Sequence, residues 1–428
     1  MYIIFEILLI MSYLLNDYLG FAMSIIIFSL LIYKNKKNIY KNFADILVLS
    51  LPLYSLSIVG DKINHAFSWI LIMLLILSIY NFFLIIKERK TISKKSFALL
   101  LLGIVLLIIS NVRTFPVYGL IEVGQVLMMI IPIITTCICK DIITKKINKK
   151  DFNNVIKRIE DVIIATAICT IIQCIAYYVL NMSIGKISIY PNRIIFDLFF
   201  KAYSVLSLFI GIGIIIAVIR IIKSLQERKI EYTEICKLIV FIIAIVINSS
   251  RTGIIAAIIT TLIILNSKIV KLESRKKREI TLVFIAIALI SIELISLTRK
   301  DMSNIFSDNE RRETYMYGIN LIAKNPINIF IGNGLSTKNY DHIMPHNFIL
   351  ETITTSGIIV TILVSLYLTK LLLYLKNTNY RFIIYCILIG SMFITCFYGN
   401  PFTTVYIILA ILDEHMKEVK EWKKNWFQ

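Results

Sequence analysis

Histidine and glutamate side chains stand at the edge of an apolar run where they could carry out acid–base chemistry. His346 precedes the run, His342 lies one helical turn before it, and Glu351 lies five residues inside the run. A helix that starts near His346 would keep its imidazole neutral through the positive end of the helix dipole, so that it can accept a proton. Glu351 would then orient the imidazole or pair with an arginine. The alternative is that His346 is a helix cap or a surface residue.

Two arginines add groups suited to binding an anion. Arg251, within the stretch SSRTG, lies between two apolar runs with no other charged residue from about 238 to 267. An arginine at this depth needs a partner or a wet cavity, and its guanidinium binds phosphate through two parallel hydrogen bonds. Arg251, together with Arg311 and the helix start near His346, indicates an anionic ligand. The alternative for Arg251 is a hairpin turn with a snorkelling side chain.

The residues 298–346 form a gap between apolar runs that is long enough to hold structure of its own. Ser307 and Glu310 have the spacing of a capping box, in which Ser307 is the N-cap. We therefore expect a helix from about 308 to 324 that ends before Asn325-Pro326.

This expected helix separates two adjacent arginines. Arg311, Tyr315, Ile319 and Ile322 recur at helical spacing and share one face, so Arg311 points toward the protein or the membrane boundary. Arg312 is turned about 100° away, toward the charged side. Arg311 could instead be a snorkelling interfacial residue, with its role taken by Arg312, by Lys338, or by Arg193 in the shorter stretch 181–198.

Composition places these residues in a membrane protein. Hydrophobic residues make up 58% of the 428 residues, charged residues 17%, and the mean hydropathy is +0.80. The apolar runs have the length of membrane-spanning helices, which predicts an all-α polytopic protein with about 12–14 transmembrane helices. We expect one transmembrane domain over 1–428 with the outward loop 298–346 within it. The expected helical runs are 2–15, 18–33, 43–60, 67–86, 97–112, 118–138, 162–180, 199–222, 237–250, 253–267, 280–297, 347–369, 381–397 and 402–413.

The positive charge follows the membrane topology. The net charge is +19, and Lys and Arg gather at every second gap between apolar runs. This is the positive-inside pattern, which predicts cytoplasmic termini and contact with anionic membrane lipids, and argues against a nucleic-acid partner. The loop 298–346 and the stretch 181–198 then face outward.

Several short motifs recur in an order that resembles a known family. They are SSRTG between apolar runs, Arg311 with Tyr315, Asn325-Pro326, Gly332-Asn-Gly334, and His346-Asn-Phe-Ile-Leu-Glu351 followed by Gly357. This order resembles the O-antigen polymerase and ligase superfamily of bacterial membrane glycosyltransferases. The resemblance covers roughly 245–365 and elsewhere rests on topology. One difference is the insertion of INIFI before Gly332, since the glycine usually comes sooner after Asn-Pro.

The resemblance implies a glycosyl transfer that uses neither metal nor cofactor, on the outward face of the bacterial inner membrane. The donor would be an oligosaccharide linked to undecaprenyl pyrophosphate. Arg251 and Arg311 would bind the pyrophosphate, and His346 would act on the acceptor hydroxyl as base or orienter. Substrate binding would also involve Arg312, Glu351, His342, Tyr315 and Arg193.

The two branches of this superfamily differ in their acceptor. A polymerase extends another lipid-linked repeat unit, whereas a ligase transfers the glycan to the lipopolysaccharide core. The composition, rich in Ile, Lys and Asn, favours a polymerase of O-antigen or capsule, with a chain-length regulator as a further partner. A flippase for the same lipid-linked saccharide is the alternative from another class, although transporters usually show repeated halves.

Overall fold

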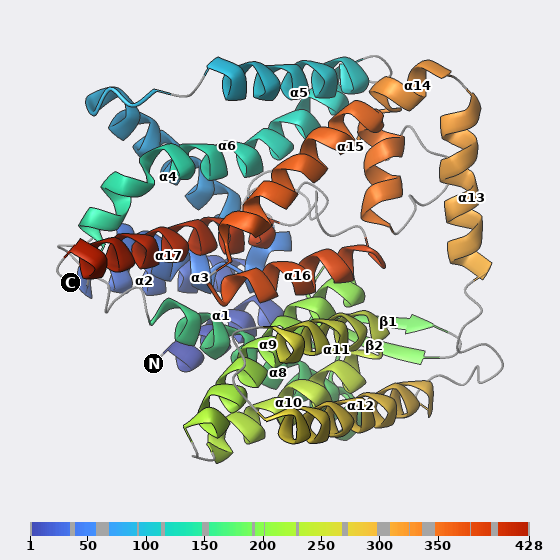
Figure 1. Ribbon diagram of the computed structural model, residues 1–428. Helices are drawn as coiled ribbons and strands as arrows, with labels where there is room; N and C mark the ends of the chain where they lie inside the picture. The colour runs from blue at the N-terminus through green and yellow to red at the C-terminus, as the bar shows by residue number, and fades with distance from the viewer. Residues whose placement is uncertain are drawn as a thin grey trace. The chain divides into compact units, whose positions relative to one another are not determined.

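The described residues fold mainly into helices (Figure 1). The computed structural model describes residues 2–34, 39–56, 68–91, 94–112, 116–147, 154–190, 193–200, 202–227, 231–267, 273–297, 309–324, 326–335, 347–376, 378–394 and 401–426. The helices before the hairpin are α1 (Tyr2–Leu15), α2 (Asp17–Lys34), α3 (Ile39–Leu49), η1 (Pro52–Ser55), α4 (Trp69–Lys87), α5 (Lys94–Val112), α6 (Pro116–Lys146) and α8 (Val155–Leu180). After the hairpin come α9 (Tyr203–Gln226), α10 (Tyr232–Asn248), α11 (Arg251–Asn266), α12 (Ser274–Leu297), α13 (Asn309–Lys324), α14 (Pro326–Ile331), α15 (Phe348–Tyr374), α16 (Tyr380–Ser391) and α17 (Pro401–Trp426).

The predicted class, an all-α polytopic membrane protein, is confirmed. Within the described residues, seven helices are long and apolar enough to cross a membrane, and three shorter apolar helices accompany them. The seven are Asp17–Lys34, Trp69–Lys87, Lys94–Val112, Leu120–Lys146, Val155–Leu180, Tyr203–Gln226 and Phe348–Tyr374. Each apolar run expected from the sequence contains a helix, but the run 43–60 is broken, because α3 ends at Leu49 and the short 3-10 helix η1 follows.

The chain forms two compact units, each built from three separate stretches. The first unit comprises Met1–Ile70, Ile147–Ile305 and Phe382–Gly390. The second unit comprises Leu71–Lys146, Phe306–Arg381 and Ser391–Gln428. The expectation of one transmembrane domain over 1–428 stays a prediction.

The first unit is organised around α9. Most side chains of this helix are buried, and it packs against α8, α10 and α11. The crossing with α11 is close because Gly211 and Gly253 face each other, and the hydroxyl group of Ser207 lies beside the backbone of Gly253. Small residues at a crossing let two membrane helices approach until their backbones touch.

A two-stranded antiparallel hairpin departs from the all-helical expectation. Its strands are β1 (Lys186–Tyr190) and β2 (Arg193–Leu198), which lie in the stretch 181–198. Gln173 of α8 fixes the hairpin, because its side-chain amide donates to the carbonyl of Lys186 at 3.1 Å and accepts from the backbone N–H of Leu198 at 3.1 Å. The hairpin therefore owes its place to a residue outside it.

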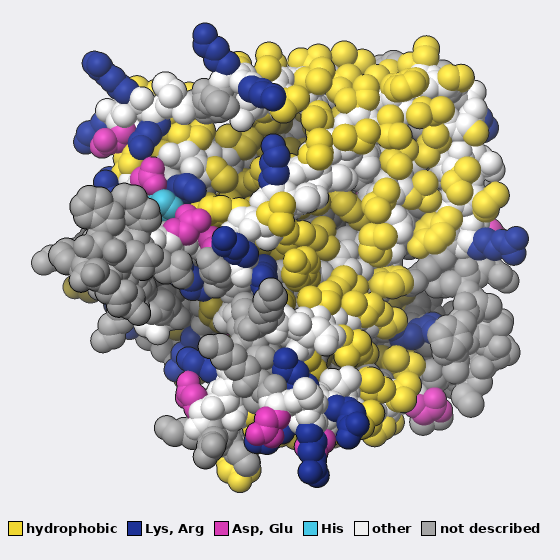
Figure 2. Space-filling model, viewed as in Figure 1, with side chains coloured by type: hydrophobic (Ala, Val, Ile, Leu, Met, Phe, Trp, Pro, Cys, Tyr) yellow, Lys and Arg dark blue, Asp and Glu magenta, His cyan; other side chains and the backbone are white. Residues whose placement is uncertain are grey.

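The second unit contains α5, α6, α13, α14, α15, α17 and most of α4. Helix α6 packs against α5 and α17, while α15 packs against α5, α13 and α14. Figure 2 shows apolar side chains spread over α5, as expected for a helix that faces lipid. The exposed apolar side chains of α5 include Phe97, Leu99, Leu101, Leu102, Val105, Ile108 and Ile109.

The long stretch 298–346 carries the helix expected from its motifs. Helix α13 spans Asn309–Lys324, close to the predicted 308–324, and ends directly before Asn325-Pro326. Pro326 then opens α14, which suits proline because the first turn of a helix needs no backbone N–H. The capping-box residue Ser307 lies outside the described residues.

Gly253→Ala should lower the melting temperature of the purified protein. The added Cβ would overlap the Ser207 carbonyl group, and overpacking of this kind costs about 1–3 kcal/mol. Gly124→Ala is the matched control, because no neighbouring atom lies within 4 Å of a Cβ at that helical position. Thermal unfolding in detergent would measure both variants. Equal melting temperatures for the two would contradict the close crossing of α9 and α11.

Candidate functional site

The turn that carries Arg251 is fixed by polar contacts in the first unit. Ser249 ends α10 in the left-handed conformation, with φ of 58°, and Arg251 opens α11. The hydroxyl group of Ser207 donates to the carbonyl of Ser250 at 3.1 Å and accepts from the N–H of Gly253 at 3.0 Å. The backbone on either side of Arg251 is thus fixed by hydrogen bonds to Ser207. The Arg251 side chain is half-buried.

The hairpin lies beside the same turn. The side-chain amide of Asn248, the last residue of α10, donates to the carbonyl of Phe196 in β2 at 3.0 Å. Arg193 is the first residue of β2, which packs against α10, the helix that ends shortly before Arg251. The side chain of Arg193 lies outside the described residues.

The start of α15 is formed by a side-chain cap. The carboxamide oxygen of Asn347 accepts from the N–H groups of Ile349 and Leu350, both at 3.1 Å. This agrees with the helix start expected near His346. Glu351 lies in the first turn and is half-buried. His346 and His342 lie outside the described residues.

A second feature of α15 is a break at Gly357. Its φ of 81° and ψ of 168° interrupt the helix ten residues after Asn347. The carbonyl groups of Thr354 and Thr355 accept from the N–H groups of Asn333 and Gly334, both at 2.8 Å. The motif Gly332-Asn-Gly334 therefore binds the backbone of α15 where the helix is interrupted.

The two backbones meet so closely that glycine is required on both sides. Gly332 has φ of 74°, and a Cβ at this position would overlap the backbone of Thr355. A Cβ at Gly357 would overlap the carbonyl group of Phe330. The inserted residues INIFI, which separate Asn-Pro from the glycines, form α14 together with Pro326 and lead the chain into this crossing.

Further polar side chains complete the crossing, and the sequence reading did not single them out. The hydroxyl group of Ser110 donates to the Thr355 carbonyl at 2.8 Å, and the carboxamide oxygen of Asn111 accepts from the N–H of Leu335 at 2.6 Å. The amide of Asn328 donates to the side chain of Asn333 at 2.6 Å. The sequence feature that could have indicated Ser110 and Asn111 is their position as two polar residues near the end of an apolar run.

Helix α13 packs against α14 and α15, next to this crossing. Tyr315 is half-buried and Arg312 is exposed, in agreement with the faces assigned to them. Ile319 is 47% exposed although it was placed on the same face as Tyr315, so that face is only partly covered by protein. The backbone of Arg311 lies in α13, and its side chain lies outside the described residues.

The candidate residues thus fall into two groups. Arg251 and Arg193 belong to the first unit, whereas Arg311, Arg312, Tyr315 and Glu351 belong to the second. The structure brings the second group onto two helices that pack together, α13 and α15. Within the described residues, no three His, Cys, Asp or Glu side chains are placed to hold a metal ion.

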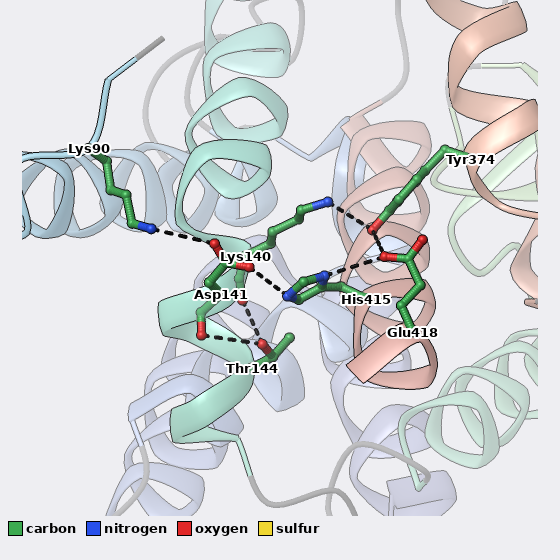
Figure 3. Close-up of polar contacts among 7 residues, drawn as sticks. All are labelled: Lys90, Lys140, Asp141, Thr144, Tyr374, His415 and Glu418. Carbon is green, nitrogen blue, oxygen red and sulfur yellow. Dashed lines mark hydrogen bonds and ion pairs between the residues drawn. The ribbon is translucent and has the colours of Figure 1, made fainter. Parts of the chain in front are cut away.

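A polar cluster that the sequence did not predict joins α17 to the C-terminal ends of α6 and α15 in the second unit (Figure 3). His415 Nε2 lies 2.8 Å from Asp141 Oδ1, and Nδ1 lies 3.6 Å from Glu418 Oε2. Lys140 donates to the hydroxyl group of Tyr374 at 3.1 Å. The sequence feature that could have indicated this cluster is the spacing of His415 and Glu418, three residues apart on one helix. The positive-inside pattern predicts that this end faces the cytoplasm.

A family model described as "Uncharacterized membrane protein (DUF2298)" matches residues 45–309, more than half of the chain. The chain belongs to this family. The match includes the turn with Arg251 and the hairpin with Arg193, and it ends where α13 begins. A search of the curated proteins found no significant match to the chain.

Gly357→Ala should destabilise the second unit. Alanine would be held at a positive φ, which costs about 1–3 kcal/mol, and its Cβ would also overlap the Phe330 carbonyl. The control is Gly103→Ala, where a Cβ would make an ordinary contact of 3.7 Å with Leu363. Hydrogen exchange at Asn333 and Gly334 would speed up in Gly357→Ala alone. Unchanged protection of both amides would show that the crossing tolerates a side chain.

Asn347→Ala should weaken the start of α15 by about 1 kcal/mol, because two N–H groups lose their acceptor. Asn347→Asp keeps an acceptor and should leave this stability nearly unchanged. Exchange rates of the Ile349 and Leu350 amides would measure the difference. Equal rates in both variants would mean that the side chain of Asn347 does not stabilise the helix start.

Proposed function

We propose that this protein is a polysaccharide polymerase of the bacterial inner membrane. It transfers a glycan from undecaprenyl pyrophosphate to the terminal sugar of another lipid-linked repeat unit, on the outer face of the membrane. The product is O-antigen or capsule polysaccharide. Both termini lie in the cytoplasm in this proposal, as the distribution of Lys and Arg predicts.

The observation that carries the proposal is the hydrogen bonding of the described residues 328–335 to the first part of α15, residues 347–357. The segment from Asn347 to Gly357 is fixed at its start by the Asn347 cap and near its end by the hydrogen bonds beside Gly357. Glu351 lies within this segment. His346 directly precedes the cap in the sequence. Two of the motifs that resemble the polymerase and ligase superfamily, Gly332-Asn-Gly334 and the segment from Asn347 to Gly357, are therefore parts of one local structure, which packs against the helix that carries Arg311.

The proposed reaction is a displacement at the anomeric carbon. The acceptor hydroxyl oxygen bonds to this carbon, while the bond to the pyrophosphate oxygen breaks and that oxygen keeps the electron pair. The hydroxyl proton passes to His346. Negative charge grows on the departing pyrophosphate, and Arg251 and Arg311 supply the opposite charge. Losing one such group commonly lowers the rate on the order of a hundredfold or more.

The remaining candidate residues bind substrate in this proposal. Glu351 orients His346 or pairs with an arginine, so Glu351→Gln should lower polymer synthesis. The half-buried ring of Tyr315 offers a surface on which a sugar ring can stack. Arg312, His342 and Arg193 contact the lipid-linked saccharide. The reaction uses no metal and no cofactor, and a chain-length regulator is an additional partner.

The flippase alternative draws support from one specific observation. Transporters place interrupted helices at their binding sites, and α15 is interrupted at Gly357. Such breaks normally recur at matching positions in two halves, and none of the other described helices contains one. The polymerase therefore remains our proposal, with ligase and flippase as outcomes of the same test.

The test uses a strain that lacks this gene and receives wild type, Arg311→Ala, Arg251→Ala or Arg275→Ala. Arg275 is the control, since its side chain is 83% exposed and paired with Glu279 one turn away on α12. Gels of surface and lipid-linked saccharide should show single repeat units, with long chains absent, in the empty strain and in the two site variants. Arg275→Ala should restore long chains as wild type does.

Other patterns in the same gels would overturn the assignment. Long chains that accumulate on the lipid carrier would identify a ligase. Repeat units trapped on the cytoplasmic side would identify a flippase. Long chains in Arg311→Ala, with absent chains in the empty strain, would keep the polymerase but remove Arg311 from its site.

A further inference from the structure

Glu6 of α1 is a fully buried carboxyl group that has no polar partner among the residues that the structure describes. Its side chain is 0% exposed. Neither carboxyl oxygen accepts or shares a hydrogen bond, and no basic residue pairs with it, within the part of the chain that the structure describes. Helix α1 is apolar over 14 residues, and Glu6 lies in its second turn. A lone acid in this position needs a physical explanation.

The other buried carboxyl groups of the first unit are compensated. Asp45, also 0% exposed, pairs with Arg158 and accepts from the hydroxyl group of Tyr2 at 2.9 Å. Glu160, also 0% exposed, has a lysine Nζ 2.9 Å from one oxygen and an arginine nitrogen 2.6 Å from the other, contributed by Lys237 and Arg220. The same unit therefore places basic partners beside these two buried carboxyl groups, and Glu6 differs from them.

Helix α8, a neighbour of α1, uses buried threonine hydroxyl groups for its own backbone. Helix α1 packs against α2 and α8. On α8, the hydroxyl groups of Thr166 and Thr170 donate to backbone carbonyls of their own helix, at 2.9 and 3.0 Å. The titratable group of α8 that lies within electrostatic range of Glu6 is the Cys169 thiol, which is itself buried. These groups of α8 thus do not stabilise a negative charge at Glu6.

An ionised carboxylate in an apolar site without a partner is so costly that binding a proton is the cheaper state. We propose that Glu6 is a proton-binding site within the membrane, a carboxyl group that carries its proton at neutral pH. Ionisable groups inside membrane helices typically serve proton or ion movement rather than packing. The ligand of this site is a proton, and the site is independent of the glycosyl transfer proposed above.

Infrared spectra of the full-length protein in lipid discs at neutral pH would test this site. A protonated carboxyl group absorbs in a carbonyl stretching region separate from that of carboxylates. We expect Glu6→Gln to remove a band from the protonated region, and Glu6→Asp to retain it. Asp45→Asn, the control at a paired acid, should leave the protonated region unchanged. A carboxylate band lost in Glu6→Gln, with the protonated region intact, would overturn the proposal.

A second measurement needs no variant, in case Glu6→Gln fails to fold. Dicyclohexylcarbodiimide, an apolar reagent, adds to protonated carboxyl groups. The acid proton moves to a carbodiimide nitrogen, and a carboxyl oxygen bonds to the central carbon, so the whole reagent is gained. Mass spectrometry of peptides from the treated wild type should find this gain at Glu6 and not at Asp45. A gain at neither residue, or at both, would contradict the assignment.

Discussion

Backbone groups that leave a helix inside a membrane must find new partners, because lipid offers no hydrogen bonds. The second unit meets this constraint at Gly357, where the Asn333 and Gly334 amides replace the helical donors of Thr354 and Thr355. These bonds form only because two backbones nearly touch, which requires glycine at 332 and 357. The segment with Glu351 and the packing of α13 both depend on this crossing, so the candidate site is built upon it.

The first unit uses a related arrangement with a different donor. Gly211 and Gly253 bring α9 and α11 together, and the Ser207 hydroxyl group bridges the turn between Ser250 and Gly253. The glycines and serines of both motifs therefore have packing roles. Arginine is not a residue type that a close crossing requires, so the arginines are the members of these motifs for which a chemical role is the natural interpretation.

Helices were predictable from the sequence because hydrophobic length and proline position are local properties. The end of α13 at Lys324 follows from Pro326, and the start of α15 follows from the change of polarity near His346. The hairpin was not predictable, since Gln173 of α8 holds it in place. The partners of the crossing, Ser110 and Asn111, lie more than 200 residues before it in the sequence, and no local pattern announces such a pairing.

The interleaved order of the two units has a consequence for synthesis on the ribosome. The first unit includes Phe382–Gly390, and Gly390 packs against Leu208 of α9. Domains normally fold in order as the chain emerges, beginning with the N-terminal one. Here the first unit stays incomplete until nearly the whole chain has been translated, and the second unit ends later still. Helices inserted early must therefore persist in the bilayer, partly unpacked, until their last partners arrive.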